Sequence, residues 1–176
     1  MKKSVKKILS LVIMLVLTVG VVGAGYVVKS AGPKVYMGDP VDISAMNAEA
    51  YKVKALEQDE EGNYIVYALS PGYYETDMEV AVAFEPTCST ILAVRVVSHS
   101  ETQGLGSKIT EADYLAQFVE MQAPVTVGGL KAVNPATEAE NTNATAFDSV
   151  IAATISSKAL GKAINNAYFF LNDCVK

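Results

Sequence analysis

Tryptophan is absent from this 176-residue sequence, and histidine and cysteine are rare, with one and two copies. The two well-separated cysteines, Cys88 and Cys174, are too few for a zinc or iron–sulfur site formed by this chain alone. An oxidising location would allow a disulfide, although the spacing leaves that pairing open. The sequence also lacks a phosphate-binding Gly-x-x-x-x-Gly-Lys loop, a dinucleotide fingerprint and a nucleophile elbow. We therefore predict no metal ligands, no catalytic residues and no complete active site on this chain.

Acidic residues are absent from residues 1–29, and residues 8–28 contain no charged side chain of either sign. A helix over these 21 residues would be about 31 Å long, which matches a hydrocarbon core of about 30 Å. A cleaved signal peptide is the alternative, but this apolar run is long for one and no clear Ala-x-Ala site follows it. Four lysines precede the run and one follows it. The positive-inside rule then predicts a single-pass helix in the cell membrane (plasma or inner), with a cytoplasmic N-terminus and an extracytoplasmic domain.

Basic residues are scarce beyond this segment. Removing the five lysines of residues 1–29 leaves 9 basic against 19 acidic residues, a formal charge of −10. Nucleic acids are bound largely by neutralising their phosphates, so such an acidic domain is a poor candidate for that function. We expect residues 1–29 to form the basic start and transmembrane helix, 30–48 a linker and entry segment, and 49–176 one extracytoplasmic domain large enough for a core.

Alternating apolar residues predict four strands, at residues 51–56, 64–69, 78–84 and 90–98, joined by short polar turns. Consecutive strands with short turns favour an antiparallel meander. The last of the four is rich in Ile and Val, so we expect it to be central. The predicted fold class is therefore α+β, with a mostly antiparallel sheet and flanking helices.

Signals between and after these strands are weaker. Residues 41–51 favour a short helix, and residues 125–127 and 130–133 are expected to pair as a hairpin. Residues 110–113 resemble a capping box, with Asp in place of Glu at its last position. The helix that follows is expected to turn one apolar face to the core, formed by Tyr114, Leu115, Phe118 and Val119.

The clearest helix is the last one. Its apolar residues recur at spacings of three and four: Leu160, Ala163, Ile164, Ala167, Tyr168 and Leu171. Thr154, Ser156 and Ser157 lie at its start, where side-chain oxygens can accept bonds from unpaired backbone N–H groups. The positive end of the helix dipole also suits a phosphate there, and Lys158 adds a cation. An ordinary capped helix that packs on a core remains the alternative interpretation of these residues.

The start of this helix resembles the flavin-attachment motif of the FMN-binding domain family. That family includes the G subunit of Rnf-type ferredoxin:NAD oxidoreductases and the C subunit of sodium-translocating NADH:quinone oxidoreductases. Its motif is Asp, two variable residues, Ser or Thr, usually Gly, then Ala-Thr, and the final Thr holds FMN through a phosphoester. Asp148, Ala153 and Thr154 match it, whereas Ile151 and Ala152 stand where the family has Ser or Thr and usually Gly. The resemblance implies covalent FMN on Thr154.

A second segment, residues 98–108, resembles the family's His-x-Glu-Thr-Pro-Gly-Leu-Gly loop, with Gln103 in place of Pro. The two motifs follow in the family's order, and the likeness extends over most of the chain. Glycines in this loop permit close approach of the backbone to a ligand. Together the two motifs imply a cofactor site formed by these residues: His99, Glu101, Thr102, Gly104, Leu105, Gly106, Lys108, Ala153, Thr154, Ile155, Ser156, Ser157 and Lys158. Judged without the motif, His99 is better interpreted as a hydrogen-bonded structural residue than as a catalyst.

The resemblance implies an electron-transfer subunit of a membrane-bound, ion-translocating oxidoreductase of the Rnf type. Other subunits would be its partners and would handle ferredoxin and NAD, and a flavin transferase would modify it. Two alternatives remain open. One is a membrane-tethered scaffolding or binding domain that has lost the flavin, favoured by Ile151, Ala152 and Gln103. The other is a stand-alone flavinylated reductase. The donor, the acceptor, the coupling ion and the redox potential do not follow from the residues.

Overall fold

The computed structural model describes residues 34–128 and 130–176. Within these residues, Val35–Lys176 forms one compact unit. No helix in this part of the chain is both long and apolar enough to cross a membrane. The predicted membrane helix at residues 8–28 lies outside the described residues.

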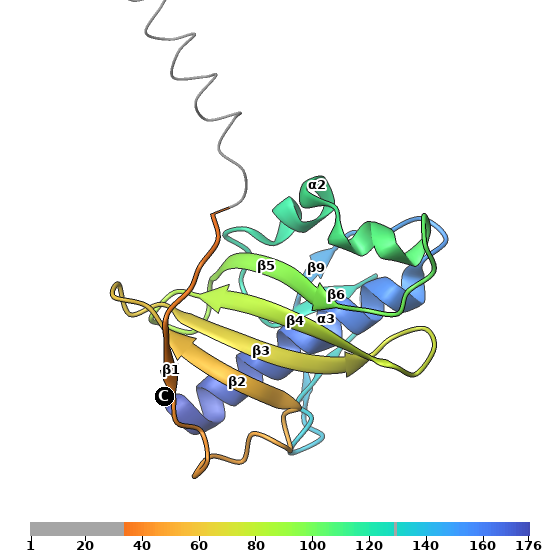
Figure 1. The fold of residues 1–176 in the computed structure, drawn as a ribbon. Coiled ribbons are helices and arrows are strands. Elements are labelled where there is room, and N and C mark those ends of the chain that lie inside the picture. The colour runs from red at the N-terminus through yellow and green to blue at the C-terminus, as the bar shows by residue number, and fades with distance from the viewer. Residues whose placement is uncertain (1–33, 129) are drawn as a thin grey trace, which may run out of the picture. The chain divides into compact units, whose positions relative to one another are not determined.

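A five-stranded antiparallel sheet forms one layer of the unit (Figure 1). Its strands follow their order in the chain: β1 Asp39–Val41, β2 Val53–Gln58, β3 Tyr64–Pro71, β4 Asp77–Phe84 and β5 Ile91–Ser98. The four predicted strands and their antiparallel meander are confirmed. The short β1 adds an edge strand to β2, which the sequence did not indicate.

Two expectations about this sheet are wrong. β5 lies at an edge instead of the centre, and only Ile91 and Val94 of this strand are buried, whereas Arg95 and Val97 are exposed. Its Ile and Val content reflects one packed face and not burial on both. Residues 41–51 were expected to contain a short helix, but residues 44–51 form a series of turns.

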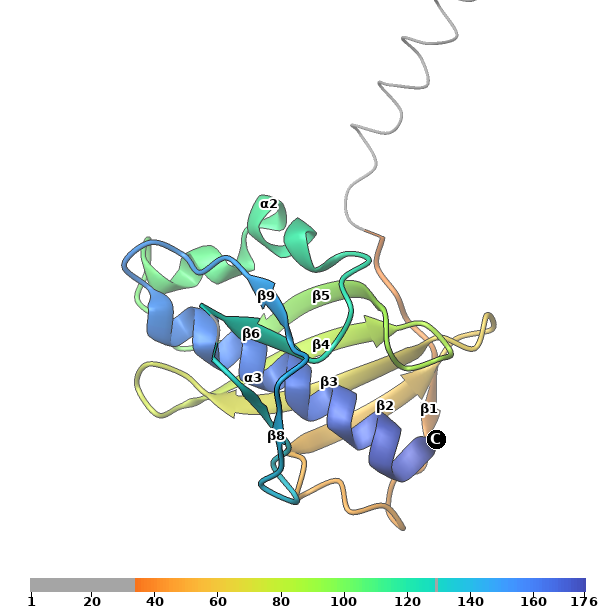
Figure 2. The same cartoon turned by 180° about the vertical axis from the view of Figure 1, so that it is seen from behind.

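The long helix α3, Thr154–Phe170, crosses one face of the sheet (Figure 2). The predicted apolar stripe is buried along it, with only Tyr168 partly exposed. Leu160 and Ile164 are fully buried, and each contributes about 1.5–3 kcal/mol relative to an exposed side chain. The chain ends in one π-helical turn, η3 Leu171–Val175.

A third layer covers the side of α3 that faces away from the sheet (Figure 2). β6 Val125–Val127 pairs in parallel with β9 Thr145–Phe147, and β7 Ala132–Val133 pairs with β8 Glu140–Asn141. The predicted hairpin between residues 125–127 and 130–133 is therefore wrong. The buried Asn165 amide of α3 explains where β6 docks, since it donates to Val125 O and accepts from Val125 N, both at 2.8 Å.

Short helices connect β5 to β6 as η1 Gly106–Thr110, α2 Ala112–Leu115 and η2 Ala116–Phe118. The predicted capping box does not form, because the Thr110 hydroxyl donates to Ser107 O at 2.8 Å and α2 has no side-chain cap. Of the expected apolar face, Phe118 is fully buried while Val119 is exposed. The pattern predicts one regular helix, whereas the chain turns at the end of η2.

The two cysteines are both free. Cys88 is buried in the core, and this burial raises the pKa of its thiol. Such a thiol is largely protonated and is a poor nucleophile.

Candidate functional site

A cavity of about 390 Å³ opens at the N-terminal end of α3. Three segments far apart in the sequence form its wall: the β3–β4 turn, the start of η1 with the loop before it, and the start of α3 with the turn before it. The lining residues are Tyr73, Tyr74, Glu101, Thr102, Leu105, Gly106, Ala152, Ala153, Thr154, Ile155 and Ser156.

The Glu101 carboxylate joins these three segments. One oxygen accepts a hydrogen bond from Tyr73 N at 2.9 Å, and the other accepts one from the Ser156 hydroxyl. Glu101 is 9% exposed, so the carboxylate links the β3–β4 turn to α3 from a buried position. Hydrogen bonds to a charged group are stronger than neutral ones, and this pair therefore holds the cavity wall together.

Gly106 allows this close packing. A Cβ at this position would lie 2.6 Å from Ser156 Oγ and 2.9 Å from the Glu101 carboxylate. No side chain fits in that space. Gly106 is thus required by the approach of η1 to α3, whereas Gly104 is required by its φ of +73° and has open space around it.

Tyr73 and Tyr74 form the aromatic part of the cavity wall. Their rings meet edge to face with centroids 4.9 Å apart, and the two side chains are 54% and 59% exposed. The Tyr74 hydroxyl shares a hydrogen bond of 3.2 Å with Thr102 Oγ1. Exposed aromatic rings beside a cavity offer a surface on which a planar ligand can stack. The two motifs do not include them, and tyrosines at the end of a strand more often serve in packing, so the sequence did not place them in the predicted site.

The start of α3 presents free hydrogen-bond donors to this cavity. Within the described residues, no side chain caps this end of the helix. The Ser156 hydroxyl instead donates to Glu101, and Ser157 Oγ accepts from Val150 N and donates to Ala153 O. The exposed Thr154 lies at the first helical position, beside N–H groups that have no acceptor within the helix. This arrangement, with the positive end of the dipole, suits a phosphate group.

The turn that leads into α3 keeps a glycine-like backbone at a residue that is not glycine. Ala152 has a φ of +62°, in the left-handed region. Ile151 beside it is 92% exposed. The Gln117 side chain braces the beginning of the turn, since it accepts from Asp148 N at 2.9 Å and donates to Asp148 O at 3.4 Å. The turn therefore retains a conformation that glycine would adopt without strain.

Replacing Ala152 with glycine should raise the free energy of unfolding by about 0.5–1 kcal/mol, because an L-residue is disfavoured in the left-handed region. Chemical denaturation of the purified chain measures this change. Ala153→Gly is the matched control, since Ala153 is buried with a φ of −131° and should lose stability. A loss of stability in both variants would show that Ala152 is not strained.

The structure brings together eight of the thirteen predicted site residues: Glu101, Thr102, Leu105, Gly106, Ala153, Thr154, Ile155 and Ser156. The other five do not line the cavity. His99 Nδ1 accepts a hydrogen bond from Glu101 N at 3.1 Å, which stabilises the loop that contains Glu101. Gly104 lies in the turn before η1, and Lys108 is exposed on η1. Ser157 is buried behind the cavity wall, and Lys158 lines a second cavity.

Residues 34–128 and 130–176 contain no cluster of three or more His, Cys, Asp or Glu side chains that could hold a metal ion. The family model for the FMN-binding domain matches residues 72–168 of the chain. The chain belongs to this family. The matched region contains every residue that lines the cavity at the start of α3.

Two curated relatives of this FMN-binding domain protein are both named as the G subunit of an ion-translocating oxidoreductase complex. The one from Pasteurella multocida is 27% identical over 152 residues, which cover 80% of this chain and 71% of the relative. The one from Methanosarcina acetivorans is 28% identical over 116 residues, which cover 65% of this chain and 55% of the relative. The chain thus spans most of the first relative and about half of the second.

Among solved structures, the chain is similar to the C subunit of the Na⁺-translocating NADH-quinone reductase from Parabacteroides distasonis. The TM-score is 0.50 at 19% identity, over 69% of this chain and 62% of that one. At this identity the likeness shows a shared fold.

The cavity fits an FMN group. Its volume lies within the range of about 300–1,000 Å³ that is usual for small-molecule sites. Its walls combine the aromatic rings of Tyr73 and Tyr74 with the exposed apolar side chains of Leu105 and Ile155. A free hydroxyl and uncapped helix N–H groups lie at its edge, where the FMN phosphate would be held.

Proposed function

We propose that this chain is an electron-transfer subunit of a membrane-bound, ion-translocating oxidoreductase of the Rnf type, with FMN attached covalently to Thr154. The observation that supports it most directly is the position of Thr154. Its exposed side chain lies at the edge of a cavity that suits a planar ligand and beside helix donors that suit a phosphate.

Covalent attachment needs little from the protein beyond this position. A flavin transferase would form a bond between the Thr154 oxygen and the phosphorus of the FMN phosphate. The threonine hydroxyl would lose its proton, and one P–O bond of the flavin donor would break, so that its oxygen substituent leaves with that proton; the net product is FMN and the chain joined with loss of one water. The neighbouring serines are poor competitors, because the Ser156 and Ser157 hydroxyls are buried and hydrogen-bonded. The N–H groups at the start of α3 then remain available to hold the phosphoester oxygens.

FMN bound here would supply one- and two-electron transfer, while the protein orients the ring and tunes its surroundings. Because the Tyr73 and Tyr74 rings are perpendicular to each other, one of them would stack on the face of the flavin ring and the other would meet its edge. Leu105 and Ile155 would cover another part of the ring. Thr102 would offer a hydroxyl to the polar edge of the ring. The Glu101 carboxylate would keep the three wall segments together.

The scaffolding alternative rests on the departures at Ile151, Ala152 and Gln103. The conformation of the turn argues for a retained flavin site, since Ala152 keeps a positive φ despite the loss of glycine. Ferredoxin and NAD would be handled by other subunits of the complex. The N-terminal segment would hold this domain on the extracytoplasmic side.

The intact mass of the chain tests both the covalent flavin and the uncleaved N-terminal anchor. The chain is purified from membranes after co-expression with a flavin transferase. We expect the mass of the full sequence increased by that of FMN less one water. A mass lacking residues 1–25 or 1–30 would rule out the uncleaved anchor. An unmodified full-length mass would favour the scaffolding alternative.

A further inference from the structure

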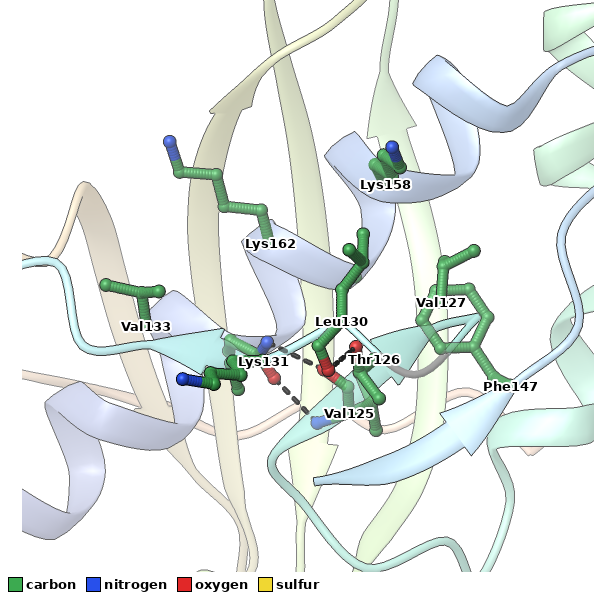
Figure 3. Close-up of a pocket in the computed structure, with 12 residues that line it drawn as sticks. Val125, Thr126, Val127, Leu130, Lys131, Val133, Phe147, Lys158 and Lys162 are labelled. Carbon is green, nitrogen blue, oxygen red and sulfur yellow. Dashed lines mark hydrogen bonds between the residues drawn. The ribbon is translucent and has the colours of Figure 1, made fainter. Parts of the chain in front are cut away.

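A second cavity, of about 290 Å³, lies along α3 on the side covered by β6 and β7 (Figure 3). It is separate from the cavity at the start of the helix, and the two share no lining residue. Its lining residues are Val125, Thr126, Val127, Leu130, Lys131, Ala132, Val133, Phe147, Lys158, Gly161, Lys162 and Asn165. The function proposed above uses none of this surface.

The interior of this cavity is apolar. Val125, Val127 and Phe147 are buried and form much of its wall. The polar groups in the wall already have partners, since Thr126 Oγ1 donates to Leu130 O at 2.5 Å and the Asn165 amide is paired at both ends with the Val125 backbone. A ligand in this cavity would therefore meet an apolar surface.

Its rim is cationic. Lys158 and Lys162 extend from α3 beside Leu130 (Figure 3), four residues apart and thus on the same face of the helix. In the part of the chain that the structure describes, neither lysine has an ion-pair partner, whereas Lys131 pairs with Glu140. Two like charges at this spacing repel each other, and an anion placed between them would relieve that repulsion.

Apolar side chains also remain uncovered at the opening. Leu130 and Val133 are 51% and 46% exposed, and both line the cavity. A ligand that places an apolar body inside and an anionic group at the rim would cover these side chains and neutralise the lysines. Such a cationic rim is unusual for a domain with a formal charge of −10 over residues 30–176.

We propose that this cavity binds a small organic anion, a carboxylate attached to an apolar body of one or two rings or a short acyl chain. The volume of about 290 Å³ is just below the usual range of about 300–1,000 Å³, which restricts the site to a compact ligand. The carboxylate lies between Lys158 and Lys162, and the apolar body lies against Val127, Leu130 and Phe147.

Calorimetric titration of the full chain in lipid nanodiscs with 2-naphthoate tests this site, with empty nanodiscs titrated in parallel to subtract partitioning into lipid. We expect Lys158→Gln/Lys162→Gln to weaken binding about tenfold. Leu130→Asp places a negative charge at the opening and should weaken it similarly. The control Lys52→Gln/Lys54→Gln removes two charges away from the cavity and should bind as the unaltered chain does.

Neutral naphthalene-2-carboxamide has the same apolar body and should bind about tenfold more weakly than 2-naphthoate. Equal binding of the two probes, or of the lysine variant and the unaltered chain, would overturn the proposal, as would undetectable binding at millimolar concentration. The titration is repeated with Thr154→Ala, and the same affinity is expected. If 2-naphthoate bound only to Thr154→Ala, the tethered flavin would occupy this cavity in the unaltered chain. That result would overturn the separate anion site while supporting the flavin proposal.

Discussion

Replacing Thr154 with alanine should abolish covalent attachment of FMN. A phosphoester requires a hydroxyl, and the other two hydroxyls at the start of α3 are buried and hydrogen-bonded. The fold should be unaffected, because Thr154 is exposed and caps nothing, so the stability change should stay within about 0.5 kcal/mol. In-gel flavin fluorescence of the denatured chain, co-expressed with a flavin transferase, measures the attachment.

Thr154→Ser is the matched control for this experiment. It keeps a hydroxyl at the same helical position and should retain fluorescence, which separates the loss of the acceptor from a general effect of mutation. Fluorescence that survives in Thr154→Ala would show that the attachment site is elsewhere. Loss of fluorescence in both variants would mean that the transferase reads the threonine methyl group as well.

A methyl group at Gly106 should have the largest effect on the cavity itself. Its carbon would lie 2.6 Å from Ser156 Oγ and 2.9 Å from the Glu101 carboxylate, so these groups must separate. Glu101 would then lose a hydrogen bond while remaining buried. We expect Gly106→Ala to lower the free energy of unfolding by about 2–4 kcal/mol, from overpacking together with the lost charged hydrogen bond. Chemical denaturation measures the change in stability, and the visible spectrum reports the flavin surroundings.

Gly104→Ala provides the comparison for this variant. Gly104 belongs to the same loop and has a φ of +73°, but a Cβ there would meet no atom within 4 Å. Only the conformational cost of about 1 kcal/mol is then expected. If both variants lost the same stability and gave the same flavin spectrum, the contact between η1 and α3 would not be what shapes the cavity.

Local patterns predicted the regular elements well. The period of two in residues 51–98 and the three-and-four spacing in residues 160–171 each arise from burial of one face of one element, so a short window contains the whole signal. The order of strands in space depends on contacts outside such a window. The edge position of β5 and the parallel pairing of β6 with β9 were therefore missed.

The candidate site likewise contains residues that local motifs predict and residues that only long-range contacts bring into place. Two short motifs were enough to name Thr154 and the loop around Glu101, because the residues within each motif are neighbours in the chain. The placement of Tyr73 and Tyr74 in the cavity wall depends on a bond from Tyr73 N to a carboxylate 28 residues away. No local pattern reports such a contact.

The proposed attachment residue, the two motifs and the main elements follow from the amino-acid order, since each depends on residues close together in the chain. Which hydroxyl at the start of α3 stays free follows only from the packed molecule. Ser156 is 55 residues from Glu101, and the folded chain brings them together as a buried pair. That contact occupies one hydroxyl, the turn from Val150 to Ala153 occupies the Ser157 hydroxyl, and Thr154 is left facing the cavity.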